Sequence, residues 1–195
     1  MSQVLRLPLW LLISTLWLTV SMTTVAQDEC DTSPADWDVS MVWESDGSLV
    51  HFDGTRTAKI PLHGQYLRSV EVSDAYVAWV TSPTYKGFGL HRLFVWNGVC
   101  TTQLTTYFPP ERGSLQYDLS GHTVVWRDAI DMQWNGTDRI VVWNGATNTL
   151  TNLDSANSNW DVRTDGEHVV WRSCNYDCQL LLWDGSEIIT VTPYQ

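Results

Sequence analysis

Four acidic residues share one place in four recurring phrases of the sequence. They are Asp38, Glu71, Asp118 and Asp161, and each has an apolar or aromatic residue on both sides. In a β-strand this alternation puts the acid on the face opposite its two neighbours. If the four strands line one channel, the acids form an anionic ring. Carboxylate oxygens suit a hard cation, so the pattern predicts a metal site that takes Ca²⁺, with no other cofactor.

The same acids have two other uses. Each can hydrogen-bond the backbone of the neighbouring repeat, or pair with an arginine such as Arg127 or Arg172, although only two of the four repeats carry that arginine. Two carboxylates in proximity also serve glycoside hydrolysis. Acids that are related by a repeat lack the distinct partners that hold an acid and a nucleophile at different pKa values. The sequence therefore favours a protein that is not an enzyme, with an extracellular hydrolase as the alternative.

No other residues form a recognisable catalytic set. The five histidines share no metal-ligand spacing and no common position in the repeat. The sequence also lacks a Gly-x-Ser-x-Gly elbow, a zinc-protease helix and a phosphate-binding loop. We predict no catalytic residue.

A repeat of short β-type runs has to position the acids. A Val-Val-Trp-like phrase ends at Trp43, Trp79, Trp126 and Trp171, which are 36, 47 and 45 residues apart. A second apolar run follows each phrase and ends in Asp-Gly or Asn-Gly, a strong hairpin signal. No window has the 3.6-residue periodicity of a helix. Four strands in each unit at this period predict an all-β chain of β-propeller blades, at about 36–60, 66–105, 114–151 and 159–192.

The third unit carries a resemblance to a known family. Its phrases Ser120-Gly121, Val124-Val125-Trp126, Val142-Trp143-Asn144-Gly145 and Leu150-Thr151 resemble the TolB-like β-propeller repeats. The repeat itself indicates a propeller of about four four-stranded blades. The resemblance implies the propeller fold, and its motifs are structural, so they leave activity open. Such propellers usually have six or more blades. Either four blades close into a small ring, or the chain is an arc that another copy completes.

Most tryptophans follow the repeat. Seven of them occupy two recurring positions, and we expect these to lie in the core between blades. They are Trp43, Trp79, Trp126 and Trp171, and Trp96, Trp143 and Trp183. Trp134 lies in an insert without a counterpart, so we expect it to face solvent or a ligand.

The loops between the second and third strands of the units differ most in sequence. Variable loops on a rigid repeat commonly carry binding, although ordinary loop variation is the alternative. Their aromatic and flexible apolar residues predict a binding rim for a protein or a carbohydrate. The candidate ligand-binding residues are Tyr85, Phe88, Met132, Trp134 and Tyr176.

The N-terminal residues 1–26 have the pattern of a secretory signal peptide, namely a basic Arg6, an apolar run and a small-residue end at Ala26. A membrane anchor is the alternative, but the run is short for a span. Cleavage leaves residues 27–195 as one domain, with no further insertion into a membrane and an extracellular or cell-envelope location. It also changes the net charge from −11 to −12. A chain this acidic is a poor partner for nucleic acid.

All four cysteines follow the predicted cleavage site. An even number outside the cytosol favours two disulfides. Cys174 and Cys178 flank a three-residue loop, so a bridge between them is easy, and Cys30 would then pair with Cys100. A zinc site is less consistent with four spread cysteines.

Overall fold

The computed structural model describes residues 41–86, 90–105, 115–129, 138–153, 158–175 and 177–192. Fifteen β-strands and no helix occur in these residues, as the β-branched and aromatic composition of the runs predicts. Accordingly, the described part of the chain contains no helix that is long and apolar enough to cross a membrane.

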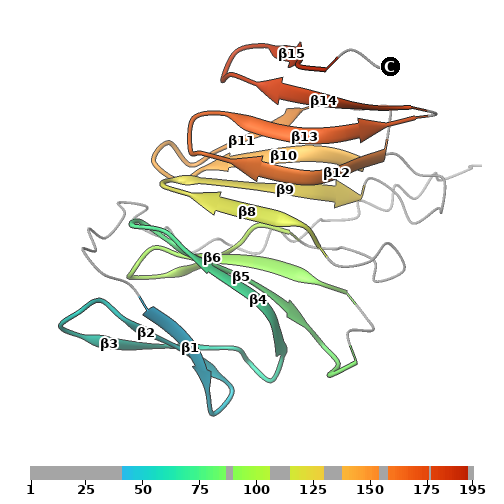
Figure 1. Ribbon diagram of the computed structural model, residues 1–195. Coiled ribbons are helices and arrows are strands. Elements are labelled where there is room, and N and C mark those ends of the chain that lie inside the picture. Colours follow the sequence, from blue (N-terminus) through green and yellow to red (C-terminus); the bar gives the residue numbers. More distant parts are fainter. Residues whose placement is uncertain are drawn as a thin grey trace, which may run out of the picture.

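The strands form four antiparallel sheets, each a simple meander in chain order (Figure 1). The first contains β1 (Met41–Ser45), β2 (Ser48–Phe52) and β3 (Thr57–Pro61). The second contains β4 (Tyr66–Val72), β5 (Val77–Ser82), β6 (Arg92–Trp96) and β7 (Thr101–Gln103). The third contains β8 (Tyr117–Ser120), β9 (Thr123–Ala129), β10 (Asp138–Asn144) and β11 (Thr149–Leu153). The fourth contains β12 (Ser158–Thr164), β13 (Val169–Cys174), β14 (Cys178–Trp183) and β15 (Ile188–Thr190).

The sheets stack face to face in chain order and form an open arc (Figure 1). The main contacts between sheets join neighbours only: β1 with β4, β4 with β8, and β12 with β8, β9 and β10. The first sheet (blue) and the fourth sheet (red) lie at opposite ends of the stack. Within one chain, therefore, the four sheets do not close into a ring. The strand expected before β1, in residues 36–40, lies outside the described residues.

One pattern of side chains builds every junction between sheets. Each sheet has an A face, which packs on the next sheet, and a B face, which packs on the previous one. The A face of the third sheet consists of Val125, Ile140, Val142 and Leu153. The B face of the fourth sheet consists of Val169, Trp171, Leu181 and Trp183. These two faces form one hydrophobic cluster, in which aliphatic side chains cover the tryptophans.

The other two junctions repeat this register. Strand pairing places Ala78, Leu93, Val95 and Leu104 on the second A face. It places Val124, Trp126, Val141 and Trp143 on the third B face, in the same cluster. The first A face contains Val42, Leu49, His51 and Ile60, against Val77, Trp79, Phe94 and Trp96. Sequence positions that match in the repeat therefore have matching packing partners.

The tryptophans mostly follow the expectation of a core between sheets. Five of the seven are buried, namely Trp79, Trp96, Trp126, Trp143 and Trp171, and Trp183 is half-buried. For Trp43 the expectation is wrong, because 45% of this residue is exposed. Trp43 lies on the B face of the first sheet, and no sheet precedes this one in the described residues. Trp134 lies outside the described residues.

Polar turns connect the strands and also join the sheets. In the Asp-Gly turns, the aspartate accepts hydrogen bonds from backbone N–H groups, as Asp53 Oδ1 does from Thr55 and Arg56, while Gly54 takes a positive φ of 93°. Between sheets, Ser73 Oγ donates to the carbonyl of Gly121, 2.9 Å away. At the next junction a threonine Oγ1 makes a similar bond to the carbonyl of Gly166. These bonds join the second sheet to the third and the third to the fourth.

The predicted disulfide between Cys174 and Cys178 closes the hairpin of β13 and β14. Cys100 is also disulfide-bonded. Cys30, its expected partner, lies outside the described residues.

The Cys174→Ser, Cys178→Ser double variant should lower the free energy of unfolding by about 2 kcal/mol, because a bridge over so short a loop removes little entropy from the unfolded chain. Urea unfolding of both proteins at one protein concentration measures this difference. A loss above about 4 kcal/mol would mean that the bridge does more than close its own hairpin.

Candidate functional site

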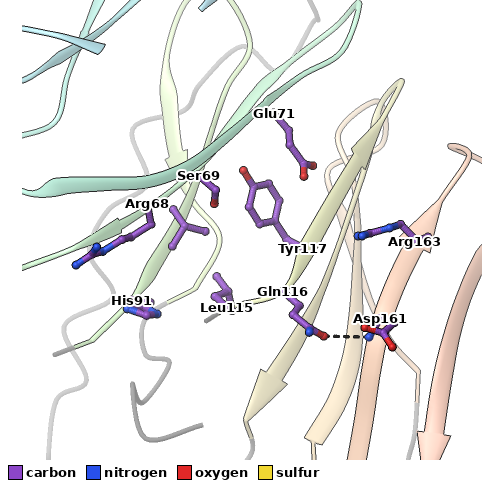
Figure 2. A pocket seen from close by; sticks show the side chains of 10 residues that line it. Arg68, Ser69, Glu71, His91, Leu115, Gln116, Tyr117, Asp161 and Arg163 are labelled. Carbon is purple, nitrogen blue, oxygen red and sulfur yellow. Dashed lines mark hydrogen bonds between the residues drawn. The ribbon is translucent and has the colours of Figure 1, made fainter. Parts of the chain in front are cut away.

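A cavity lies at the inner edge of the arc, where β4, β8 and β12 are the first strands of their sheets (Figure 2). Its volume is about 460 Å³, within the usual range of sites for small ligands. Charged side chains of both signs line it: Arg68, Glu71, Asp161 and Arg163. The residues Leu115, Gln116 and Tyr117 form its wall between the second and fourth sheets.

Two of the four predicted acids hold equivalent positions. Glu71 lies opposite Ala78, and Asp118 lies opposite the corresponding Val125. Each accepts a hydrogen bond from a backbone N–H of the next inner strand, Glu71 from Leu119 and Asp118 Oδ2 from Thr164 at 2.7 Å. The structural role considered for these acids, a bond to the neighbouring repeat, is therefore present at two successive junctions.

The expected position of Asp161 in this register is wrong. A β-bulge between Trp160 and Arg163 inserts an extra residue into β12, and Asp161 has a positive φ of 55°. As a result Arg163, and not Asp161, lies opposite Val170 at the position of Glu71 and Asp118. Asp161 instead pairs with Arg172, 3.0 Å away, and both side chains are exposed.

At this position the inner strands β4, β8 and β12 therefore carry Glu71, Asp118 and Arg163. This row contains two acids and one base, whereas the sequence predicted a ring of acids only. The fourth predicted ligand, Asp38, lies outside the described residues. Within the described ranges, no three histidine, cysteine, aspartate or glutamate side chains are grouped closely enough to hold a metal ion. The Ca²⁺ site stays a prediction, and the cation that the row does contain is the guanidinium of Arg163.

Glu71 is the pocket carboxyl group whose pKa is strongly shifted. Burial, followed by the nearby charge of Asp118, raises the pKa of Glu71 from 4.5 to about 7, although the Leu119 N–H and the charge of Arg163 oppose the rise. One carboxylate oxygen, Oε2, is buried without a hydrogen-bond partner in the described part of the chain. A buried carboxylate oxygen without a donor is costly, which agrees with the raised pKa of Glu71.

Stability should fall as the pH rises through this pKa. The folded state holds the Glu71 proton up to about pH 7, whereas the unfolded chain releases it near 4.5, so deprotonation favours unfolding between these values. For a partly exposed group we expect a loss on the order of 1–2 kcal/mol between pH 5 and pH 8. Glu71→Gln should remove this part of the slope and stabilise the protein at pH 8. Urea unfolding at four pH values measures it.

Comparing the pH dependence of stability in the wild type and in Glu71→Gln separates the contribution of Glu71 from those of the other acids. Burial also raises the pKa of Asp128, so the wild-type slope alone has more than one source. Three turn residues affect stability only below pH 4, because backbone N–H groups lower their pKa to about 2. They are Asp53, Asp165 and Asp184. Glu44→Gln, at an exposed position of β1, serves as the control. Equal slopes for the wild type and Glu71→Gln would contradict this assignment.

Uncharged groups keep the pocket in shape. The Tyr117 hydroxyl donates to the carbonyl of Ala78 at 3.3 Å, and burial raises the pKa of this phenol. Gln116 Oε1 accepts the backbone N–H of Asp161, 3.0 Å away, and so joins the third sheet to the bulge of the fourth (Figure 2). Sequence reasoning missed Gln116 and Arg163, because the position of Arg163 and the bond from Asp161 to Gln116 both depend on the bulge.

Of the predicted rim residues, only Tyr85 is described. It follows β5, is 78% exposed, and meets Tyr66 edge to face with ring centroids 5.8 Å apart. Arg68, which lines the pocket, donates to the carbonyls of Thr84 and Tyr85, both 2.8 Å away. The structure thus links this loop to the pocket. Phe88, Met132, Trp134 and Tyr176 lie outside the described residues.

Comparison with known proteins supports the fold. No family model and no curated protein matches the chain. An acylaminoacyl peptidase, solved in complex with Z-Gly-Gly-Phe-chloromethyl ketone, has a similar structure with a TM-score of 0.50 and 14% identity, over 82% of this chain and 26% of that one. The β-propeller domain of the Trilobed protease from Pyrococcus furiosus gives a TM-score of 0.47 and 12% identity, over 75% and 46%.

The Pyrococcus horikoshii acylaminoacyl peptidase gives a TM-score of 0.49 and 12% identity, over 78% of this chain and 29% of that one. The chain thus spans less than half the length of each of these structures. At such identities the likeness concerns the fold alone. Together with the four stacked antiparallel sheets, it identifies the chain as an all-β protein of β-propeller blades.

Proposed function

We propose that the protein is a non-enzymatic β-propeller module that binds a peptide segment of another protein at the inner pocket and the adjoining rim. The observation that carries the proposal is the pocket of about 460 Å³, which three sheets line with charges of both signs. A peptide carries both signs and many hydrogen-bonding groups, so it suits this lining better than a neutral carbohydrate does. The buried Oε2 of Glu71 offers an acceptor for a ligand N–H.

The rim supports the same proposal. Tyr85 and Tyr66 expose aromatic surface beside the pocket, and tyrosine provides contact area at a low cost in conformational entropy. Arg68 holds the loop of Tyr85 through two backbone carbonyls, so a ligand in the pocket reaches the rim without a large rearrangement. The other predicted rim residues extend this surface in the proposal.

We further propose that the blades belong to the TolB-like repeats and that the protein acts outside the cytosol or in the cell envelope. The Val-Val-Trp and Asn-Gly phrases support the family, and the B-face tryptophans give these phrases a packing role. The disulfide of Cys174 and Cys178 and the bonded state of Cys100 support an oxidising compartment. The leader-like residues 1–26 agree with it.

Arrays of short peptides and of glycans, incubated with labelled protein, test the proposed function. We expect binding to a subset of peptides that contain charges of both signs. Gln116→Ala and Tyr85→Ala should each weaken the affinity for the best peptide at least tenfold, because one forms the pocket wall and the other the rim. Val99→Ala is a matched control, because Val99 is 76% exposed on a turn that belongs to neither.

Two other results would overturn the proposal. Binding confined to glycans would replace the peptide with a carbohydrate ligand. Cleaved glycans that mass spectrometry detects, with cleavage lost in Glu71→Gln, would instead establish the hydrolase alternative, in which carboxylates at the inner edge of the arc do the chemistry.

A further inference from the structure

The two ends of the arc expose apolar sheet faces. On the fourth sheet, strand pairing places five apolar residues on the A face, with Arg172 among them. They are Val170, Leu180, Leu182, Ile189 and Val191. Leu180, Ile189 and Val191 are 37%, 40% and 47% exposed. The B face of the first sheet contains Met41, Trp43, Val50 and Phe52, with Lys59 paired to Val50. Met41 and Trp43 are 53% and 45% exposed, whereas Val50 is 4% exposed. Soluble monomers rarely expose such contiguous apolar surface.

These two faces are the missing halves of one junction. The fourth A face matches, position by position, the third A face, whose four residues are at most 4% exposed beneath the fourth sheet. The first B face likewise matches the fourth B face, where Trp171 is fully buried at the position of Trp43. At each internal junction a mainly aliphatic A face covers a B face that contains tryptophan, and His51 is the exception on the first A face. The exposed ends have these same compositions.

A second copy of the chain is the occupant that satisfies both ends together. The two faces complement each other, but they lie at opposite ends of the arc, so they cannot meet within one chain (Figure 1). Two copies arranged head to tail make two identical junctions, each continuing the stacking that already joins the four sheets.

We propose that two copies of this chain associate head to tail, the fourth A face of each against the first B face of the other, and close a ring of eight sheets. Eight blades lie within the usual range of propellers. Head-to-tail contacts of this kind form closed rings when the rotation between copies closes. The inner strands of both copies would then line one central channel, with two copies of the pocket around it.

Sedimentation of the full-length, disulfide-intact protein measures the mass of the assembly, and two variants test the faces. We expect a dimer for the wild type. Trp43→Glu, on the B face, and Leu182→Lys, on the A face, should each raise the dissociation constant at least 100-fold. Val99→Glu, which puts the same charge on an exposed turn away from both faces, should leave it unchanged. Circular dichroism and thermal midpoints check that each variant is folded.

Mixing the two variants identifies the arrangement. In a head-to-tail dimer of one Trp43→Glu chain and one Leu182→Lys chain, one junction is intact and the other brings glutamate near lysine. The equimolar mixture should therefore recover dimer that neither variant forms alone. A wild-type monomer at every concentration, an oligomer with another number of chains, a dimer that both variants preserve, or a mixture that stays monomeric would each overturn the proposal.

Discussion

Trp171→Ala should cost about 3–5 kcal/mol of unfolding free energy, the usual loss for a large aromatic side chain in a core. Trp171 is fully buried between β9, β10 and its own sheet. Trp43→Ala, at the same position of the repeat, should cost only about 1 kcal/mol in dilute protein, because half of that side chain already faces solvent. The two substitutions remove the same atoms, so a difference between their losses of unfolding free energy reports the difference in packing.

Urea unfolding at a concentration where the protein is monomeric measures both losses. Trp126→Ala, in the neighbouring junction, should resemble Trp171→Ala, because it is 2% exposed in an equivalent cluster. Similar losses at Trp43 and Trp171 would contradict the assignment of Trp43 to an uncovered face. They would also contradict the register of A and B faces.

Arg127→Ala should cost about 3–5 kcal/mol, because it leaves the buried Asp138 carboxylate without the cation beside it. The Arg127 Nε and Asp138 Oδ2 atoms are 3.1 Å apart, and each side chain is only 3% exposed. The guanidinium of Arg127 also lies 4.1 Å from the centroid of the Trp160 ring, in the next sheet. This arginine therefore joins two sheets and neutralises a buried acid.

Arg172→Ala is the matched control, because Arg172 occupies the corresponding position in the fourth sheet. Its ion pair with Asp161 is exposed, so its loss should cost under about 1 kcal/mol in dilute protein. Thermal and urea unfolding of both variants measure the difference. A small loss for Arg127→Ala would mean that water or another group stabilises the negative charge of Asp138 in place of the arginine.

The sequence predicted the strands and their packing well because both have short-range signals. The Val-Val-Trp runs have the composition of strands, and each Asp-Gly or Asn-Gly pair ends one. Glycine takes the positive φ in most of these turns, as at Gly54. Repetition of the pattern then implied that equivalent residues pack alike, and the three clusters between sheets confirm it.

The candidate site was harder to predict because it depends on one irregularity. The phrase around Trp160 and Asp161 matches the other inner strands in sequence, but the bulge at Asp161 moves Arg163 into the acidic position. Nothing local in the sequence requires that bulge, although Arg163 itself is a signal, since no other inner strand has an arginine two residues after the acid. The exposure of Trp43 was also hidden, because a repeat does not reveal which of its units lie at the ends.

Amide hydrogen exchange, with and without the best array peptide, tests the binding site most directly, because it locates the ligand without changing the protein. The proposed site predicts slower exchange in β4, in residues 115–120 and in β12, the segments that line the pocket. The outer strands β3, β7, β11 and β15 should be unaffected. Protection confined to these outer strands, with β4 and β12 unchanged, would contradict a ligand site at the inner edge of the arc.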